Sequence, residues 1–257
     1  MGLLSAASLA TLVFCAPGYP GAPGDAQPLV DQFAGAAVTA SGWPAGSLAA
    51  VYDPTEEGGL AKLAQADAVL AFVPYPFYIE HGAKLHLTPL VQADVTEVGP
   101  QQRWTLVAKS GRVTDPKSMA GYTLLSSAGY APDFVRHTAL QAWALPADVK
   151  IEATGQILSA LRRAAAGEPV AVLLDQTQAV ALPSLPFAAE LKTLIQSAEL
   201  PVALIVVVDS RVAAVRAKAL QTGLLKMSQA PAGSDSLGPL RLHGFVLPNL
   251  PSRTAAP

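Results

Sequence analysis

A chain of 257 residues is long enough for one large or two modest domains, each with a buried core. Apolar residues make up 51% of the chain, charged residues 14%, and the net charge is −2, so we expect no surface for nucleic acid. No apolar run reaches the roughly 18 residues of a membrane-spanning helix, so we expect no stable membrane insertion. The single cysteine excludes an intrachain disulfide, and the four histidines lack metal-ligand spacing.

The first sixteen residues allow two interpretations. Residues 2–16 are apolar and have the length of a signal-peptide core, but no Lys or Arg precedes them. Residues 12–15 are similar to a lipoprotein cleavage box, although Phe14 is too large for the position before Cys15. Alternatively, residues 9–15 form the first buried strand, and residues 1–8 are the remnant of an export signal. We favour the strand, and whether Cys15 is lipidated or buried stays open.

The first hundred residues alternate between short apolar runs and helical patterns. A loop rich in Pro and Gly follows the first strand, and Asp25 is expected to cap the helix after it. The order β-α-β-α-β predicts a sheet of parallel strands flanked by helices. The expected strands span residues 9–15, 48–52, 68–73 and 85–91, and the second helix spans residues 60–65.

A second group of strands and helices follows residue 100. Strands are expected at residues 104–109, 122–125, 149–152 and 170–174, and helices at 132–144 and 156–166. Residues 191–198 are expected to form a helix or a loop. The apolar run at residues 201–209 is typical of a central strand. A long helix is expected at residues 211–227, and residues 240–246 are expected to dock from the C-terminal tail.

The segment Ser126-Ser127-Ala128-Gly129 ends one of these strands, and Pro132 begins the helix after it. Proline fits the first turn of a helix because its missing N–H would be unpaired there. A strand, a hydroxyl-rich turn and a helix start together direct N–H groups and hydroxyls to one point, which suits an anion. The alternative is an ordinary loop with a serine cap.

Six segments in a fixed order are similar to one known family. They are residues 63–75 (a helix, an acidic residue, a strand and a Pro/Tyr turn), 115–121, the serine-rich 124–129, 158–175, the proline-containing 199–203, and 237–245 with its closing Gly-Phe pair. Together they resemble the type 2 periplasmic substrate-binding proteins of the phosphate, phosphite and phosphonate group, which serve ABC importers. The resemblance runs from about residue 12 to residue 245.

The resemblance implies an α/β protein with the two-lobed type 2 periplasmic-binding-protein fold. Each lobe would be a mostly parallel sheet flanked by helices, and two hinge crossovers would join the lobes. Residues 9–100 and 203–257 would form lobe 1, and residues 101–202 lobe 2. A small-molecule ligand would lie between the lobes, which would close on it by hinge bending. The implied partner is an ABC transporter permease, and the implied protein is a periplasmic or extracytoplasmic monomer without a cofactor.

The C-terminal ends of five of the expected strands, with the loops that follow them, should line the cleft of such a fold. Their hydroxyls and helix-start N–H groups can bind an oxyanion, and their aromatic rings can pack against an organic tail. Asp175 would receive an ammonium or hydroxyl group of the ligand, or else only cap the helix that follows it. The candidate ligand-binding residues are Tyr19, Tyr52, Tyr75, Ser126, Ser127, Gly129, Tyr130 and Asp175.

The leading hypothesis is a binding protein without enzymatic activity that captures a phosphate- or phosphonate-like oxyanion for an ABC importer. Ala128 removes a hydroxyl from the serine loop, and Asp133 would repel an anion, so both disfavour phosphonate itself. The alternatives are an enzyme on the same scaffold and a ligand-sensing domain of a signalling system. For an enzyme, Cys15 is the candidate thiol, and no histidine has an obvious carboxylate partner in the sequence.

Overall fold

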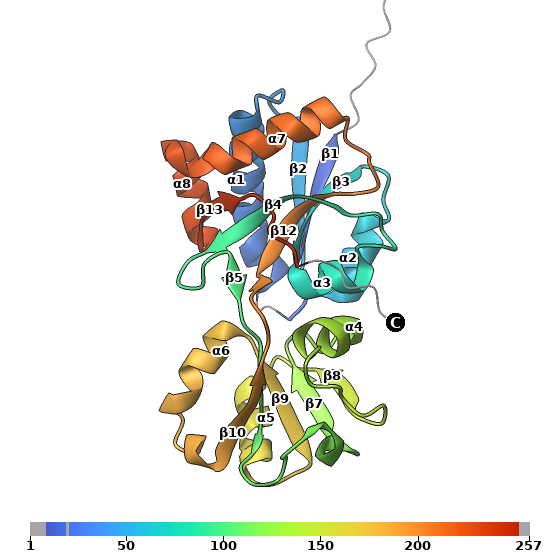
Figure 1. Ribbon diagram of the computed structural model, residues 1–257. Coiled ribbons are helices and arrows are strands. Elements are labelled where there is room, and N and C mark those ends of the chain that lie inside the picture. Colours follow the sequence, from blue (N-terminus) through green and yellow to red (C-terminus); the bar gives the residue numbers. More distant parts are fainter. Residues whose placement is uncertain (1–8, 19–20, 252–257) are drawn as a thin grey trace, which may run out of the picture.

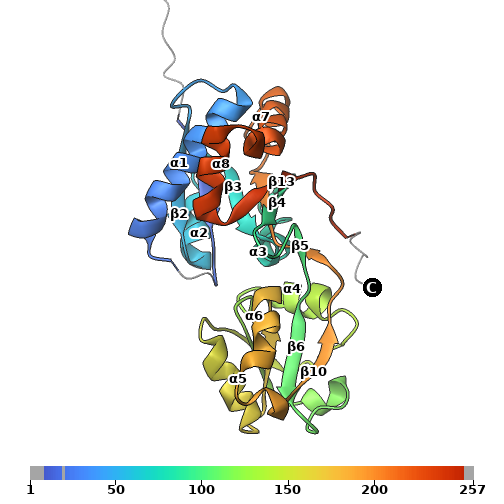
Figure 2. The same cartoon turned by 90° about the vertical axis from the view of Figure 1, so that its left-hand side faces the viewer.

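The computed structural model describes residues 9–18 and 21–251, which form two α/β lobes joined by a pair of crossover segments (Figures 1 and 2). The α/β class and the two-lobed architecture predicted from the sequence are confirmed. The sheet of lobe 1 has the order β13-β4-β12-β3-β1-β2. Its strands are β1 (Ala10–Cys15), β2 (Leu48–Asp53), β3 (Ala68–Pro74), β4 (Thr88–Val95), β12 (Ala203–Val207) and β13 (Leu242–Val246).

Lobe 2 is built on a smaller sheet with the order β10-β6-β9-β7-β8. Its strands are β6 (Thr105–Lys109), β7 (Thr123–Ser126), β8 (Lys150–Ala153), β9 (Val170–Leu174) and β10 (Leu191–Gln196). Between the lobes, β5 (Gln101–Gln102) pairs antiparallel with β11 (Leu200–Pro201). This short pair ties the two crossovers together, at the place where the sequence predicts a hinge.

The helices cover both sheets. In lobe 1 they are α1 (Pro23–Ser41), α2 (Glu56–Leu63), α3 (Tyr75–His81), α7 (Ala214–Lys226) and α8 (Pro231–Leu237). In lobe 2 they are α4 (Pro132–Phe134), which continues as a π turn over Val135–Ala139, α5 (Ile157–Ala165) and α6 (Gln176–Ala181). Figure 1 shows α4 and α6 on opposite sides of the crossover segments, both next to lobe 1.

Both sheets are mixed, which corrects the expectation of mostly parallel sheets. In lobe 1, β1 runs parallel to β2 and β3, whereas β12 runs antiparallel to β3 and β4. In lobe 2, β7 runs parallel to β8 and β9, whereas β6 runs antiparallel to β9 and β10. Strand β13 is antiparallel as well, to β4. Strands β6 and β12 each follow a crossover directly, so the chain enters lobe 2 and re-enters lobe 1 against the direction of the βαβ strands.

Three local predictions need correction. Ala22, not Asp25, is the N-cap of α1, because Pro23 already fits the first helical position, and Asp25 lies in the first turn. Residues 191–198 contain β10, an edge strand whose antiparallel pairing with β6 outweighs its helical pattern. The helix expected at residues 132–144 ends at Ala139, because the N–H of Leu140 bonds to the carbonyl of Val135 and closes a wide π turn.

Three buried clusters hold the elements together. One lies between the lobe 1 sheet and the helices α1, α7 and α8, and another lies between α5 and the lobe 2 sheet. The third crosses the junction, because it joins Val13, Tyr75 and Phe77 of lobe 1 to Trp104 and Phe134 of lobe 2. The lobes therefore share apolar surface in addition to their crossovers.

Candidate functional site

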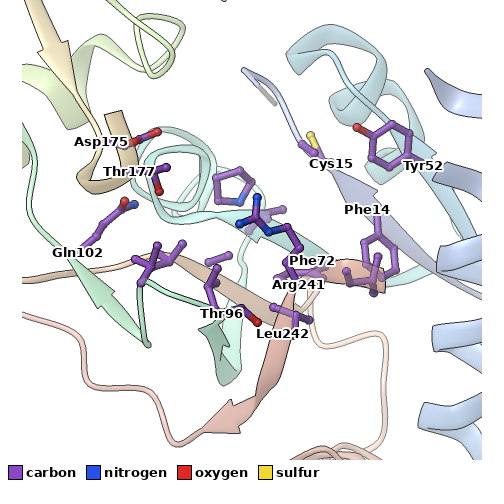
Figure 3. Close-up of a pocket in the computed structure, with 18 residues that line it drawn as sticks. Phe14, Cys15, Tyr52, Phe72, Thr96, Gln102, Asp175, Thr177, Arg241 and Leu242 are labelled. Atoms are coloured by element: carbon purple, nitrogen blue, oxygen red, sulfur yellow. The ribbon is translucent and has the colours of Figure 1, made fainter. Parts of the chain in front are cut away.

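A cavity of ≈ 370 Å³ lies between the lobes beside the crossover segments (Figure 3). Lobe 1, the crossovers and lobe 2 all contribute side chains to its wall. Figure 3 shows Asp175, Thr177 and Gln102 on one side and Phe14 and Tyr52 on the other. Its lining includes Phe14, Tyr52, Phe72, Gln102, Asp175, Thr177, Arg241 and Leu242.

The lobe 1 wall of this cavity is largely aromatic. Phe14, the last residue but one of β1, lies beside Tyr52 of β2 in the parallel register, and the ring centroids of Phe14 and Phe72 lie 5.2 Å apart in an edge-to-face contact. Burial raises the pKa of the Tyr52 phenol, and the nearby carboxylate of Asp53 adds to the effect. This wall can pack against an apolar part of a ligand and exclude water from it.

Two charged side chains line the cavity. Arg241 directly follows the short helical turn Gly238–Leu240, and its own backbone is left-handed (φ 56°). Its guanidinium donates a hydrogen bond of 2.9 Å to the carboxylate of Glu97. A guanidinium carries five N–H donors, so the bond to Glu97 leaves donors for a ligand. On the lobe 2 side, Asp175 and Thr177 lie at the start of α6, which directly follows β9. The cavity thus offers both a cation and a carboxylate.

Asp175 has a structural role as well as a place on the cavity wall. Its carboxylate accepts a hydrogen bond of 2.8 Å from the N–H of Gln178, and the Gln178 side chain accepts one from the N–H of Asp175. The sequence left open whether Asp175 only caps the helix that follows it. The capping box shows that Asp175 does cap α6, and the same residue also lines the cavity. Burial raises the pKa of Asp175, although the hydrogen bonds from Gln178 and Thr177 partly oppose the shift.

The serine loop contributes less to the cavity than the sequence suggests. Ser126 is fully buried, donates a hydrogen bond of 2.8 Å to the carbonyl of Leu173 and accepts one from the N–H of Ala128. Gly129 is buried against the backbone of Glu152, and its N–H bonds to the carbonyl of Ser126. The hydroxyl of Ser126 and the amides of 128 and 129 therefore stabilise the loop itself.

The other predicted residues fall at different places. Ser127 and Tyr130 are half-buried, and the carbonyl of Ser127 faces Gly18 of lobe 1, where an added Cβ would lie 2.4 Å from that oxygen. Tyr75 is 2% exposed and packs edge-to-face on Phe134 with ring centroids 6.2 Å apart. Of the eight predicted residues, Tyr52 and Asp175 line the cavity. Tyr19 lies outside the described residues.

Sequence reasoning missed several cavity residues. Phe72 lies within a predicted strand, so nothing local distinguished it from core, and Gln102 lies in a crossover segment, for which the sequence predicted a hinge and no ligand contact. Arg241 belongs to the tail that was expected only to dock. Its position just before Leu242 of β13 was the available signal, because docking of that strand brings its first residues to the junction.

Cys15 lines the cavity at the end of β1, and its parallel neighbour Asp53 ends β2; both residues contact α2 or the loop that leads into it. The carboxylate of Asp53 accepts hydrogen bonds from the N–H and the hydroxyl of Thr55 and from Lys62. Cys15 packs on Gly59, where an added Cβ would lie 2.0 Å from its sulfur. Burial, with the neighbouring carboxylates of Asp53 and Glu56, raises the pKa of the Cys15 thiol to about 12. The thiol is therefore protonated at neutral pH, which disfavours a nucleophilic role.

One side-chain pair was not apparent from the sequence. The Nε2 atom of His81 lies 2.7 Å from the carboxylate of Glu56, so this histidine has a carboxylate partner after all. Neither residue lines the cavity. Among the described residues, no three His, Cys, Asp or Glu side chains are grouped as metal ligands. In the same part of the chain, no helix combines the length and apolarity needed to cross a membrane.

No family model matches the sequence, and no curated protein matches it. Solved structures do match it. XAC2383 from Xanthomonas citri bound to chloride ion has a TM-score of 0.70 at 13% identity, with 95% of this chain and 93% of that one covered. PhnD1 from Prochlorococcus marinus in complex with methylphosphonate has a TM-score of 0.58 at 12% identity, with 94% and 93% covered.

A third match is the binding protein component of an ABC phosphonate transporter from Pseudomonas aeruginosa. Its TM-score is 0.59 at 13% identity, with 92% of this chain and 81% of that one covered. At these identities, the likeness to the three structures is one of fold. The chain has the two-lobed periplasmic-binding-protein fold, and its structural neighbours include phosphonate-binding components of ABC transporters.

Proposed function

We propose that this protein is a monomeric substrate-binding protein that captures a small ligand between its lobes and delivers it to the permease of an ABC importer. The observation that carries this proposal is the cavity, because lobe 1, the crossovers and lobe 2 each supply part of its wall. A ligand in such a cavity stabilises the closed arrangement of the lobes, which a permease can recognise. The proposed location is the periplasm or another extracytoplasmic compartment.

The ligand that we propose is a small organic oxyanion, phosphonate-like in its charge. Its anionic group binds the free N–H donors of Arg241, and its apolar part packs on Phe14 and Phe72. Asp175 selects for a ligand that also carries a hydroxyl, an ammonium or a bound proton, because a carboxylate accepts hydrogen bonds and repels a fully ionised group. Tyr52 and Thr177 complete the proposed contacts.

The serine loop has an indirect role in this proposal. Its buried hydroxyl and its amides shape the part of lobe 2 that adjoins the cavity, so an oxyanion binds mainly through side chains. Contacts of Ser127, Tyr130 and Tyr19 with the ligand remain predictions. The methylphosphonate complex of a structural neighbour supports the proposed class of ligand.

A thermal-shift screen tests the proposal with phosphate, methylphosphonate, methanesulfonate and ethanolamine. A ligand at one hundred times its Kd stabilises the folded protein by about 2.7 kcal/mol, which raises the melting temperature of a chain of this size by about 5–10 °C. We expect methylphosphonate to stabilise the wild type more than methanesulfonate does, because only the phosphonate carries a proton near neutral pH.

Two arginine variants provide the comparison. Arg241→Gln removes the proposed cation and should abolish the shift. Arg163→Gln is the matched control, because Arg163 is an exposed arginine of α5 that also pairs with a glutamate, Glu168. A shift that survives in Arg241→Gln, or the absence of a shift with every oxyanion, contradicts the proposed ligand class. Recovery of an unaltered ligand after long incubation would separate binding from catalysis.

A further inference from the structure

A second contact joins the lobes on the side of the junction away from α6, where α3 of lobe 1 lies against α4 of lobe 2 (Figure 1). The carboxylate of Glu80, from the last turn of α3, accepts a hydrogen bond of 3.0 Å from the N–H of Asp133. The N–H of Phe134 also bonds to this carboxylate. Neither Glu80 nor these two residues line the cavity.

The start of α4 needs an acceptor from elsewhere. The first N–H groups of a helix have no partner within it, and a side chain at the N-cap usually supplies one. Here the N-cap is Ala131, which has no polar side chain, and Pro132 has no N–H. Asp133 and Phe134 are therefore the first donors, and Glu80 satisfies them from the opposite lobe.

Apolar packing surrounds this polar contact. Phe134 is fully buried between the rings of Tyr75 and Trp104, with centroids 6.2 Å and 5.3 Å away. Tyr75 begins α3, and Trp104 precedes β6, so Phe134 bridges both lobes. Glu80 is half-buried at the rim of this packing, where burial raises its pKa and the carboxylate of Asp133 adds to that effect. The carboxylate thus keeps its position despite an electrostatic cost.

We propose that Glu80 is a positioning residue that clamps lobe 1 onto α4 of lobe 2. Its carboxylate occupies the amides at the start of α4, where the sequence predicted that an oxyanion would bind. The protein itself supplies the negative group at this place. The ligand is consequently confined to the cavity on the crossover side. This inference goes beyond ligand capture, because it concerns a contact between the lobes outside the cavity, and it holds whatever molecule the cavity binds.

Amide exchange measured residue by residue by NMR, in buffer without ligand, tests the clamp. In Glu80→Ala we expect the amides of Asp133 and Phe134 to exchange at least about fivefold faster than in the wild type, which is the effect of losing one ordinary hydrogen bond. Glu80→Gln keeps an acceptor oxygen but loses the charge that strengthens the bond, so its exchange should fall between the two.

Two controls make the result decisive. Glu57→Ala removes an exposed carboxylate from α2 in the same lobe and should leave both amides unchanged. The amide of Leu125 in β7 should exchange equally in all variants, which shows that lobe 2 stays folded. Should Glu80→Ala fail to fold, Glu80→Gln decides the question on its own. Exchange of the Asp133 amide at the wild-type rate in the glutamine variant, or in a folded alanine variant, overturns the clamp, as does equal acceleration by Glu57→Ala.

Discussion

Asp53 shows how a carboxylate at the end of a strand can serve the fold alone. It is 8% exposed and accepts hydrogen bonds from both the N–H and the hydroxyl of Thr55, at 2.9 and 2.7 Å, and from the ammonium of Lys62. Thr55 in turn caps α2 by accepting a hydrogen bond from the N–H of Gly58. The carboxylate therefore connects β2 to the helix that follows it, one position beyond Tyr52, which lines the cavity.

Asp53→Asn should destabilise the protein by about 1–3 kcal/mol, because it leaves Lys62 without its partner and weakens the bonds from Thr55. Burial raises the pKa of Asp53, but the hydrogen bonds from Lys62 and Thr55 outweigh it, so the pKa lies below its usual 3.8. The ionised carboxylate therefore stabilises the fold above that pH, and this contribution disappears as the pH falls through the lowered pKa.

Urea unfolding at pH 7 and at pH 3 measures this effect. The difference between wild type and variant should shrink at the lower pH, whereas Asp235→Asn, an exposed aspartate of α8, should change little at either pH. A difference that grows on acidification would contradict the assigned role of Asp53.

Gly18 lies where the loop after β1 touches lobe 2. Its φ is +85°, and an added Cβ would lie 2.4 Å from the carbonyl oxygen of Ser127. Gly18→Ala should therefore cost about 1–2 kcal/mol for the left-handed backbone, and a further amount for separating the loop from lobe 2. Gly121→Ala is a matched control, because Gly121 has a φ of +75° and open space around its Cα. Chemical denaturation that ranks the two variants equally would show that the contact with Ser127 contributes nothing.

At the scale of single elements, α6 combines a cap with a cavity wall, and substitution can separate the two roles. Asparagine is as good an N-cap as aspartate, so Asp175→Asn should retain the helix, whereas Asp175→Ala should lose about 1 kcal/mol. Burial raises the pKa of Asp175 in the folded protein. The ionised form is therefore penalised, and the wild type loses stability relative to the asparagine variant as the pH rises through the raised pKa.

Thermal melting from pH 4 to pH 8, with and without methylphosphonate, measures both roles. In the absence of ligand, Asp175→Asn should be at least as stable as the wild type at pH 7. Methylphosphonate should stabilise Asp175→Asn and Asp175→Ala less than it stabilises the wild type, because neither variant carries the carboxylate. Ligand stabilisation that is the same in Asp175→Asn as in the wild type would restrict Asp175 to its capping role.

The sequence predicted elements well where the signal was local. Residues 170–174 match β9, and residues 68–73 match most of β3, because continuous apolar runs bounded by turn residues have few alternatives. Residues 191–198 failed because β10 is an edge strand with a mixed pattern, and only its pairing with β6 makes it a strand. Helix 132–144 failed because the π turn after Phe134 is a tertiary feature with no sequence signal.

The candidate site could be predicted only in part, for a related reason. Tyr52 and Asp175 were found because they lie at the C-terminal ends of strands, and the C-terminal ends of parallel strands meet at one edge. The roles of Phe72 and Arg241 depend on contacts between segments that lie far apart in the sequence. The serine loop was the strongest local signal, yet the partner of the helix start beside it is Glu80 from the other lobe. A local motif cannot indicate that its amides are already paired across a junction.

At the scale of the whole molecule, the lobes are coupled through a shared core. The cluster that contains Val13 and Tyr75 of lobe 1 continues into Trp104, Phe134 and Leu173 of lobe 2. In many two-lobed proteins, motion about the crossovers is the expected response to a ligand. Here Phe134, the Glu80 contact and the approach of Gly18 to Ser127 all oppose separation of the lobes. We therefore expect the lobes to unfold together.

Tryptophan fluorescence can test this cooperativity, because Trp43 lies in lobe 1 and Trp104 in lobe 2, both largely buried. One variant, Trp104→Phe with Trp143→Phe, retains only Trp43, and the other, Trp43→Phe with Trp143→Phe, retains only Trp104. Trp104→Phe should be tolerated, because its indole N–H is buried without a hydrogen-bond partner among the described residues. Each urea curve should coincide with the curve that circular dichroism gives for the same variant, as a single transition requires.

Phe134→Ala then provides the perturbation. Loss of this fully buried ring should cost about 3–5 kcal/mol. Because the ring bridges both lobes, its loss should destabilise lobe 1, against which it packs, as well as lobe 2, to which it belongs. We expect the fluorescence transition of Trp43 to move to lower urea together with that of Trp104. If only the Trp104 transition moves and the Trp43 transition stays in place, the lobes unfold independently, and the junction is a contact surface and not a common core.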